Sequence, residues 1–166
     1  MAQKTYTLYK RIARLPRGKE IFSLIYAKKA PHFATVRPKV REVRENYAEL
    51  SIANRKAVHN HIGTLHAIAV CNGLEAAMGL LAEATCPADQ RWLPRGLQVE
   101  YLAKSTTDLL CIAETDQADW DETPGDVNIR VKAVRTDGVV VVQGIIPVYV
   151  SMKPTKDKAP TEPVSV

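Results

Sequence analysis

Glu75 is the residue of this sequence whose surroundings most clearly suggest chemistry. It lies in the middle of residues 65–84, a long apolar segment rich in small residues. None of its neighbours on a helix is a cation; the residues three and four positions away are Cys71, Asn72, Met78 and Gly79. A buried carboxylate is costly unless it is partnered or neutral. Two interpretations stay open: a catalytic carboxylate, or one that pairs with a distant arginine or reaches solvent at an edge.

The start of the same segment offers a second chemical feature. Gly63 and Thr64 precede the apolar residues, and Thr64 is a suitable N-cap. The first free backbone N–H groups then belong to residues 65–67, at the positive end of the helix dipole. Such groups can polarise a carbonyl and stabilise an oxyanion. Glu75 lies about 12 Å along the axis from Ala67 by helical rise. Both groups can therefore serve one substrate atom only at a site shared between two subunits.

The apolar segment must be a helix, because it is too long for an ordinary strand. Its length approaches that of a membrane span. Polar residues interrupt it, however, and its flanks have no aromatic belt; the interrupting residues are His66, Asn72, Glu75 and Glu83. We therefore predict no transmembrane segment. A helix that is apolar on all sides must instead be wrapped by protein.

Strand patterns flank this helix on both sides. Before it, residues 35–43 and 47–53 alternate around a tight turn at Glu45-Asn46. After it, residues 87–95 are predicted as a loop. Four strands are then expected, at residues 97–104, 109–115, 127–135 and 139–152, with irregularities at Gly144 and Pro147 in the last. Thr136-Asp137-Gly138 is a strong hairpin signal between the last two strands.

Two short helices are predicted before the first strand, at residues 5–14 and 19–29, separated by Pro16 and Gly18. The chain is thus divided into a helical extension (1–34), an α+β domain (35–152) and a Pro-rich polar tail (153–166) that we expect to be disordered. One apolar helix against an antiparallel six-stranded sheet is an α+β layer architecture. Dimerisation would close its outer surfaces.

Composition limits the function classes. The chain has 166 residues and a net charge of +5, which fits one domain and an anionic partner. No dense Lys/Arg run is interleaved with aromatic residues, so we predict no nucleic-acid binding. Three widely spaced cysteines argue against a disulfide framework and against zinc: Cys71, Cys86 and Cys111. The N-terminal residues do not have a secretory-signal pattern, and a cytoplasmic location is expected.

The sequence from Asn60 to Ala67 is Asn-His-Ile-Gly-Thr-Leu-His-Ala, and an acid follows nine positions after His66. This motif resembles the hotdog-fold thioesterase superfamily, in particular the phenylacetate-degradation-type and related acyl-CoA thioesterases. That branch typically shows Asn, then Gly-x-x-His-Gly-Gly, then Asp or Glu on the central helix at this spacing. The order of elements over residues 35–152 agrees with the same fold.

The resemblance implies a role for each matching residue. Asn60 would position the attacking water or the thioester, and the Ala67 N–H would polarise the carbonyl. Glu75 would act as general base on water, or as nucleophile through an anhydride. The residues around the helix start would contact substrate: Gly63, Thr64 and His66. In this family the site lies at a dimer interface, so a homodimer or a dimer of dimers is expected.

A thioester substrate implies coenzyme A or an acyl-carrier protein, both of which are anionic. Three cations are predicted near the site entrance, where they would meet phosphates: Arg91, Arg95 and Lys104. Ordinary surface charge is the alternative for each of them. His59 and His61 flank Asn60 without a third ligand at suitable spacing, so we predict no metal. No cofactor is expected.

This sequence departs from the family motif at the helix start. The usual His-Gly-Gly is His66-Ala67-Ile68 here, which keeps the backbone N–H but adds side chains beside it. Hydrolysis of an acyl thioester is the first hypothesis, and a non-catalytic acyl-CoA or acyl-carrier binding module is the alternative. A dehydratase is disfavoured because it normally needs an Asp/His pair, and His66 is at the wrong end of the helix from Glu75. A membrane-surface role for the basic N-terminal helices is the last alternative.

Overall fold

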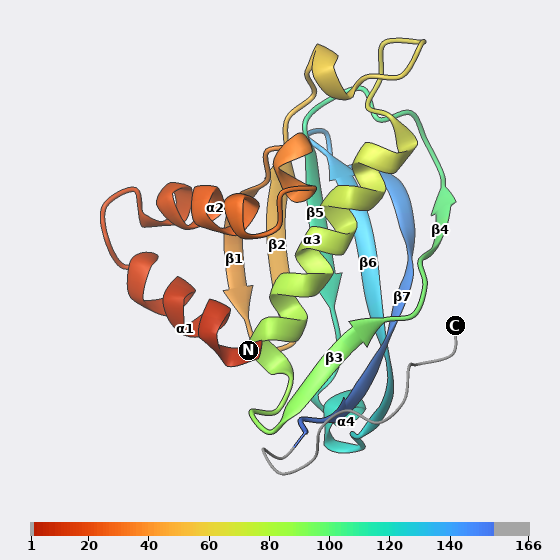
Figure 1. Cartoon of the computed structure of the whole chain (residues 1–166). Coiled ribbons are helices and arrows are strands. Elements are labelled where there is room, and N and C mark those ends of the chain that lie inside the picture. Colours follow the sequence, from red (N-terminus) through yellow and green to blue (C-terminus); the bar gives the residue numbers. More distant parts are fainter. Residues whose placement is uncertain (1, 155–166) are drawn as a thin grey trace.

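One antiparallel sheet curves around a long helix, α3 (Ala67–Thr85), in the computed structural model, which describes residues 2–154 (Figure 1). The strand order is β1-β2-β5-β6-β7-β3, and β4 also pairs with β7. The strands are β1 (Lys39–Arg44), β2 (Tyr47–Ile52), β3 (Gln90–Pro94), β4 (Gln98–Tyr101), β5 (Leu109–Glu114), β6 (Gly125–Arg135) and β7 (Val140–Met152). The α+β layer predicted from the sequence is confirmed.

The sheet has one strand more than predicted, because residues 90–94 are a strand and not a loop. β3 pairs along its whole length with the C-terminal half of β7, and β4 pairs with the residues of β7 that precede it. Pro94 and Gly96 lie at and just after the end of β3 and divide what would be one long strand into two. Proline is tolerated in β3 because this strand is at the edge of the sheet.

α3 begins at Ala67, and its N-cap is His66, so the prediction of Thr64 as N-cap is wrong. The ring Nδ1 of His66 accepts a hydrogen bond of 3.1 Å from the backbone N–H of Ile68. Thr64 is already committed to the preceding turn, where its carbonyl and its hydroxyl both accept hydrogen bonds from Asn60.

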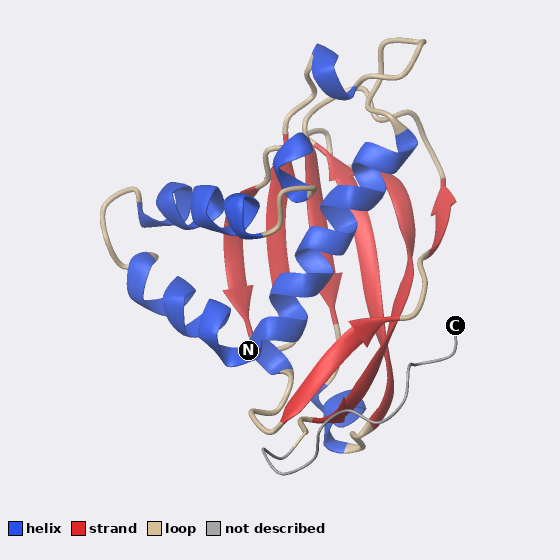
Figure 2. Ribbon diagram, viewed as in Figure 1, coloured by secondary structure: helices blue, strands red, loops and turns tan. Residues whose placement is uncertain are grey.

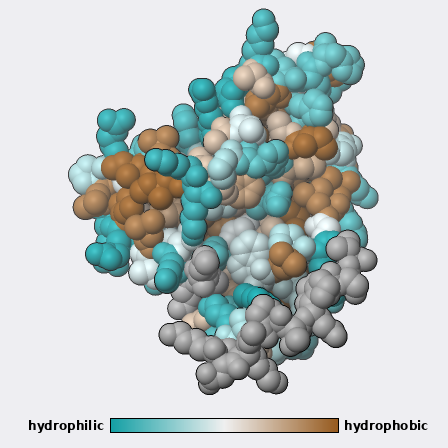
Figure 3. Space-filling view, in the orientation of Figure 1, coloured by the Kyte–Doolittle hydropathy of each residue, from teal (hydrophilic) through white to brown (hydrophobic). Residues whose placement is uncertain are grey.

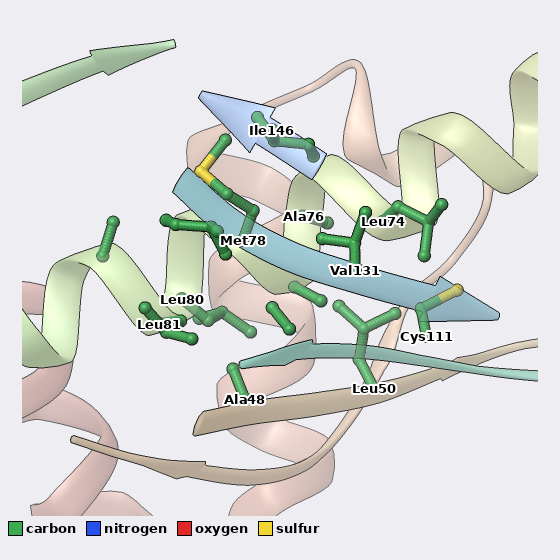
Figure 4. Packing of buried hydrophobic residues seen from close by; sticks show 14 of the residues in the cluster. Ala48, Leu50, Leu74, Ala76, Met78, Leu80, Leu81, Cys111, Val131 and Ile146 are labelled. Atoms are coloured by element: carbon green, nitrogen blue, oxygen red, sulfur yellow. The ribbon is translucent and has the colours of Figure 1, made fainter. Parts of the chain in front are cut away.

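The core lies between α3 and the concave face of the sheet (Figure 4). Leu74, Met78 and Leu81 of α3 are almost fully buried against residues such as Leu50 and Ile146. A Cβ at Gly73 would come within 2.8 Å of the Cys111 sulfur, so glycine permits the close approach of the helix to β5. α3 has the length and mean hydropathy of a membrane span, but 72% of that span is buried within the protein.

Two further helices, α1 (Ala2–Ile12) and α2 (Gly18–Lys29), pack on the same side of the sheet as α3 (Figure 2). Phe22 of α2 meets the Tyr9 ring of α1 edge-on, with 5.1 Å between centroids. The Tyr26 hydroxyl donates a hydrogen bond of 2.9 Å to the Ala76 carbonyl of α3. The N-terminal helices therefore cover a flank of α3 that the sheet does not reach.

The remaining elements are short. A 3₁₀ turn, η1 (Phe33–Thr35), ends at the first residue of the strand predicted at 35–43, and that strand begins only at Lys39. A second one, η2 (Lys56–Val58), precedes the loop before α3, and α4 (Gln117–Asp121) precedes β6. Both predicted hairpin turns are present, with positive φ at Asn46 (62°) and Gly138 (86°). The tail was predicted at residues 153–166, and its residues 155–166 lie outside the described part of the chain.

Gly144 of β7 is a packing constraint that can be tested. A Cβ there would collide with the Gln98 carbonyl and lie 2.8 Å from the Val99 Cα, both on β4. We expect Gly144→Ala to lower the free energy of unfolding by about 1–3 kcal/mol, because backbone must move to relieve the overlap. Gly96→Ala is the control, since its Cβ would have no neighbour nearer than 3.9 Å. Urea denaturation of both variants measures the difference; equal midpoints would contradict the prediction.

Candidate active site

One stripe of α3 runs beside the edge of the sheet. It contains Cys71, Glu75, Gly79 and Glu83, which are spaced four residues apart and so share a helical face. The Cys71 sulfur lies 3.1 Å from the Tyr101 hydroxyl of β4. A Cβ at Gly79 would lie 3.3 Å from the Tyr26 hydroxyl and 3.6 Å from the Trp92 ring of β3. The stripe therefore lies along the seam between α2 and the edge formed by β3 and β4.

A hollow of about 410 Å³ opens beside this stripe. Its apolar walls come from α2, η1, α3 and β3 and include Tyr26, Phe33, Met78, Trp92 and Pro94. Glu75 and Glu83 line the same hollow, with Thr5 and Lys29 at its margin. The structure thus surrounds two carboxylates with an apolar cavity large enough for a small organic group.

The Glu75 side chain is half-buried and makes no ion pair or hydrogen bond with any other residue in the range 2–154. The alternative in which a distant arginine neutralises it therefore does not hold for the described part of the chain. The carboxylate reaches the hollow and, through it, solvent. The other non-catalytic interpretation, a carboxylate that reaches solvent at an edge, therefore stays open beside the catalytic one, for which the same access would admit substrate and water.

The second carboxylate of the hollow, Glu83, is in a different environment. Burial raises its pKa, while a hydrogen bond with Thr5 and the charge of Lys29 act in the opposite direction. Lys29 in turn donates a hydrogen bond of 2.9 Å to the Thr5 hydroxyl. Burial and the charges of Glu83 and Glu75 raise the pKa of Tyr26, which keeps its hydroxyl protonated as a donor to Ala76.

The residues before α3 form a closed turn. The Asn60 side-chain oxygen accepts from the N–H groups of Ile62 and Thr64, both at 3.1 Å, and its amide nitrogen donates to the Thr64 hydroxyl at 2.8 Å. Gly63 has φ of 80°, which this turn requires. Hydrogen bonds within the turn therefore bring Asn60 and Thr64 together around Gly63. The turn precedes α3, and Glu75 lies about two helical turns beyond the helix start.

Most donors at the start of α3 are already used. The Leu65 N–H donates to the Ser105 carbonyl at 3.0 Å, and the His66 N–H donates to the Val58 carbonyl at 2.8 Å. The Ile68 N–H is capped by the His66 ring. Within residues 2–154 the N–H groups of Ala67 and Ala69 have no hydrogen-bond partner, and Ala67 is the one at the first helical position.

The structure separates the three predicted phosphate contacts. Arg91 and Arg95 lie on the sheet face opposite α3, where Arg91 bonds to Ser151, and Arg95 pairs with Asp126 and covers the Tyr149 ring. Trp92 and Pro94, which alternate with them, point into the hollow. Lys104 instead precedes Ser105, the residue that binds the backbone of Leu65 just before α3. Only Lys104 of the three is therefore close to the helix start.

Two side chains at the seam were not predicted from the sequence, Tyr101 and Trp92. Tyr101 reaches Cys71 from β4. Partial burial, and to a smaller extent the hydrogen bond with Cys71, raise the pKa of Tyr101 to about 12. Trp92 lay in a segment predicted as loop. Because Cys71 lies four residues before Glu75, the sequence alone places the two on one helical face. Their neighbours on β3 and β4 could not be predicted in this way, because they depend on strand register.

Neither metal chemistry nor a reactive buried thiol has support in the described residues. No group of three or more His, Cys, Asp or Glu side chains in residues 2–154 could hold a metal ion. The His59 ring is instead hydrogen-bonded to the Asn54 side chain. Burial raises the pKa of the Cys111 thiol to about 12, so it is not a nucleophile at neutral pH.

A helix wrapped by a curved antiparallel sheet is the hotdog fold, and solved structures of named thioesterases share it. A probable thioesterase from Pseudomonas aeruginosa is 16% identical, with a TM-score of 0.72 over 84% of this chain and 97% of that one. A thioesterase family protein from Silicibacter pomeroyi is 17% identical, with a TM-score of 0.66 over 83% of this chain and 100% of that one. These likenesses establish the fold.

The chain belongs to the family described as "Domain of unknown function (DUF4442)", whose model matches residues 18–150. A structural-genomics protein, APC5556, is 39% identical to it, with a TM-score of 0.79 over 90% of this chain and 98% of that one. Among proteins with curated descriptions, none matches the sequence.

The cap of α3 gives a prediction for the site. Replacing His66 with Ala removes the acceptor for the Ile68 N–H and should lower the free energy of unfolding by about 1 kcal/mol. His66→Asn is the matched control, because asparagine is a strong N-cap residue and restores an acceptor. Thermal or urea unfolding of the three proteins measures this. A variant series in which Ala and Asn are equally stable would show that the cap contributes nothing.

Proposed function

We propose that this protein hydrolyses acyl thioesters, with acyl-CoA as the substrate class and Glu75 as the catalytic carboxylate. The observation that carries the proposal is the Glu75 side chain, which has no structural partner among the described residues and lines an apolar hollow. A carboxylate is not kept in such a place for stability, because an unpaired charge next to apolar walls is unfavourable. The shared fold of named thioesterases supports the same reaction.

In this mechanism the thioester carbonyl meets the free Ala67 N–H at the positive end of α3. Glu75 takes a proton from water as the water oxygen attacks the carbonyl carbon. The Ala67 N–H stabilises the oxyanion of the tetrahedral intermediate. The carbon–sulfur bond then breaks, and Glu75 gives the proton it took from water to the departing sulfur, which yields a carboxylic acid and the thiol and restores the carboxylate. Attack by Glu75 itself, with an anhydride that water hydrolyses, uses the same two groups.

The two groups belong to different subunits in this proposal. They are about 12 Å apart along one helix axis, which is too far for one carbonyl group. The edge that flanks the stripe exposes large apolar side chains, including Leu93, Leu97, Tyr101 and Leu102, and Ile68 lies exposed near the start of α3. Such an edge is suited to a two-fold contact, in which the helix start of one chain faces the Glu75 of its partner.

The hollow would hold the acyl group, and the basic groups would meet the anionic part of the substrate. Tyr26, Phe33, Met78 and Trp92 supply the apolar contacts that an acyl chain needs. Lys104 beside the helix start is the cation best placed for a phosphate. Arg91 and Arg95 lie on the opposite face of the sheet, so we do not assign them a contact with the substrate bound in the hollow of their own subunit.

Two observations favour the alternative, a non-catalytic acyl-thioester binding module. The Asn60 side chain makes three hydrogen bonds within its own turn and so has little capacity left for a water or a thioester. Ile68, in place of the usual glycine, is 61% exposed beside the helix start and narrows the approach to the Ala67 N–H. Calorimetry that gives tight binding of acyl-CoA, without release of free thiol, would establish this alternative.

The first functional prediction concerns the carboxylate. Glu75→Gln should lower turnover of an acyl-CoA panel by about 100-fold or more, because the amide cannot accept the proton from water. Glu83→Gln is the control in the same hollow and on the same stripe, and it should stay within a few-fold of wild type. Release of free thiol measures both. Equal activity of Glu75→Gln and wild type, or no turnover on any acyl chain, would reject the hydrolase.

The second prediction concerns the backbone donor. Ala67→Pro removes the N–H at the first helical position, where the proline ring is tolerated. The preceding residue, His66, has ψ of 138°, which suits a following proline. Turnover should fall by about 100-fold, whereas Ala67→Gly, which keeps the N–H, should retain most activity.

Mixing the two inactive proteins tests the shared site. A mixed dimer contains one Glu75→Gln subunit and one Ala67→Pro subunit. If each site is made in trans, one of its two sites has both groups intact and the other has neither. Random exchange of subunits should therefore restore about a quarter of wild-type activity. A site made within one subunit predicts no recovery, and that outcome would reject the shared geometry while leaving the hydrolase intact.

A further inference from the structure

The outer surface of the N-terminal helices carries large apolar side chains that the fold does not use. Leu24 is 73% exposed, and four other residues of α1, α2 and their connection are also exposed: Leu8, Leu15, Ile21 and Ile25. In Figure 3 a hydrophobic patch lies over α1 and α2, with hydrophilic side chains around it. We call these five residues the hairpin patch.

The hairpin patch is separate from the core-facing side of α2. Phe22, Ser23 and Tyr26 are buried and attach the helix to the rest of the protein. Ile21, Leu24, Ile25 and Lys28 share the opposite face by their helical spacing. α2 is therefore apolar on two faces, and only one of them is needed for folding.

Cations border the hairpin patch on the side of β1. A groove of about 730 Å³ between α2 and β1 has Leu24, Ala27, Ala34 and Pro38 among its walls. Four cations line it: Lys28, Arg37, Lys39 and Arg41. Among residues 2–154 none of the four forms an ion pair, and Glu20 is the one acid at the groove. The groove therefore has uncompensated positive charge next to exposed leucine.

The α1 side of the hairpin patch repeats this combination. Leu8 lines a shallow hollow of about 390 Å³ with Lys4, Thr7 and Arg11. Apolar side chains in the centre with cations on both sides are what an anionic lipid surface binds, since the acyl region accepts the former and the headgroups the latter. A second copy of the chain would instead bring like charges together across the contact.

We propose that the hairpin patch and its flanking cations dock this protein on anionic lipid membranes. Leu24 and Ile21 enter the headgroup–acyl boundary, and Lys28, Arg37 and Lys39 contact the lipid phosphates. The docked face lies beside the candidate active site, because Lys28 lines the cationic groove and the next residue, Lys29, lines the hollow of Glu75. The proposal does not depend on the hydrolase activity.

Co-sedimentation of the full chain with vesicles tests the proposal. We expect binding to phosphatidylcholine vesicles that contain about a quarter phosphatidylglycerol, little binding to pure phosphatidylcholine, and a loss of binding as salt is raised. The double variant Ile21→Gln/Leu24→Gln removes the apolar part, and Lys28→Glu/Arg37→Glu removes charge. Each should weaken the partition coefficient by about tenfold or more.

The control is Arg91→Glu, which changes the same charge on the opposite face of the sheet and should bind as wild type does, apart from a small effect of net charge. Circular dichroism and thermal unfolding verify that each variant folds.

Unchanged binding of both double variants, or no binding of wild type to anionic vesicles, overturns the proposal. Sedimentation equilibrium in which Ile21→Gln/Leu24→Gln dissociates an oligomer, without any vesicle binding, would assign the patch to a second copy instead. Pyrophosphate binding that depends on Lys28 and Arg37, with no vesicle binding, would overturn it in favour of a soluble anion.

Discussion

The burial of α3 is the constraint on which the rest of this structure depends. A helix that is apolar on nearly every side cannot be left on one flat sheet, so the sheet curves around it and the N-terminal helices cover a further flank. Glycines at positions 73 and 79 permit the close contacts to β5 and to Tyr26 that this enclosure needs. What remains open is the seam beside β3 and β4, and Glu75 lies on it.

The same enclosure explains why the start of α3 retains a free donor. Two long-range backbone hydrogen bonds, from Leu65 to Ser105 and from His66 to Val58, hold the chain as it enters the helix. The His66 ring then satisfies Ile68. Since a helix start has several donors without intrahelical partners, these contacts determine which ones are left among the described residues: Ala67 at the first helical position, and Ala69 two residues further on. The free donors at the start of α3 and the half-buried Glu75 thus both follow from how α3 is anchored at one end and enclosed along its length.

Local patterns predicted most of the fold, and tertiary contacts decided what they missed. The alternating strands, the turns at Asn46 and Gly138 and the helical character of α3 follow from spacing and residue type. β3 was not predicted because Pro94 and the charged Arg91 are untypical of a strand. Its pairing with β7, which a local pattern does not contain, makes it one. His66 and Thr64 are both able to cap, and the commitment of Thr64 to the Asn60 turn selects His66.

The candidate site was predicted in part for the same reason. Glu75 could be found from the sequence because its helical neighbours have no cation, which is a local property. The sheet face of Arg91 and Arg95, and the contacts of Tyr101 and Trp92 with the stripe, depend on strand register and were beyond a local pattern. α2 joins the two surfaces that the fold leaves exposed, with Lys28 at the cationic groove and Lys29 at the hollow. Under the two proposals, an acyl thioester partitioned into the membrane by its acyl chain would need to move only across α2 to reach Glu75, so membrane docking would raise the local concentration of an amphiphilic substrate without any change in the chemistry of the site.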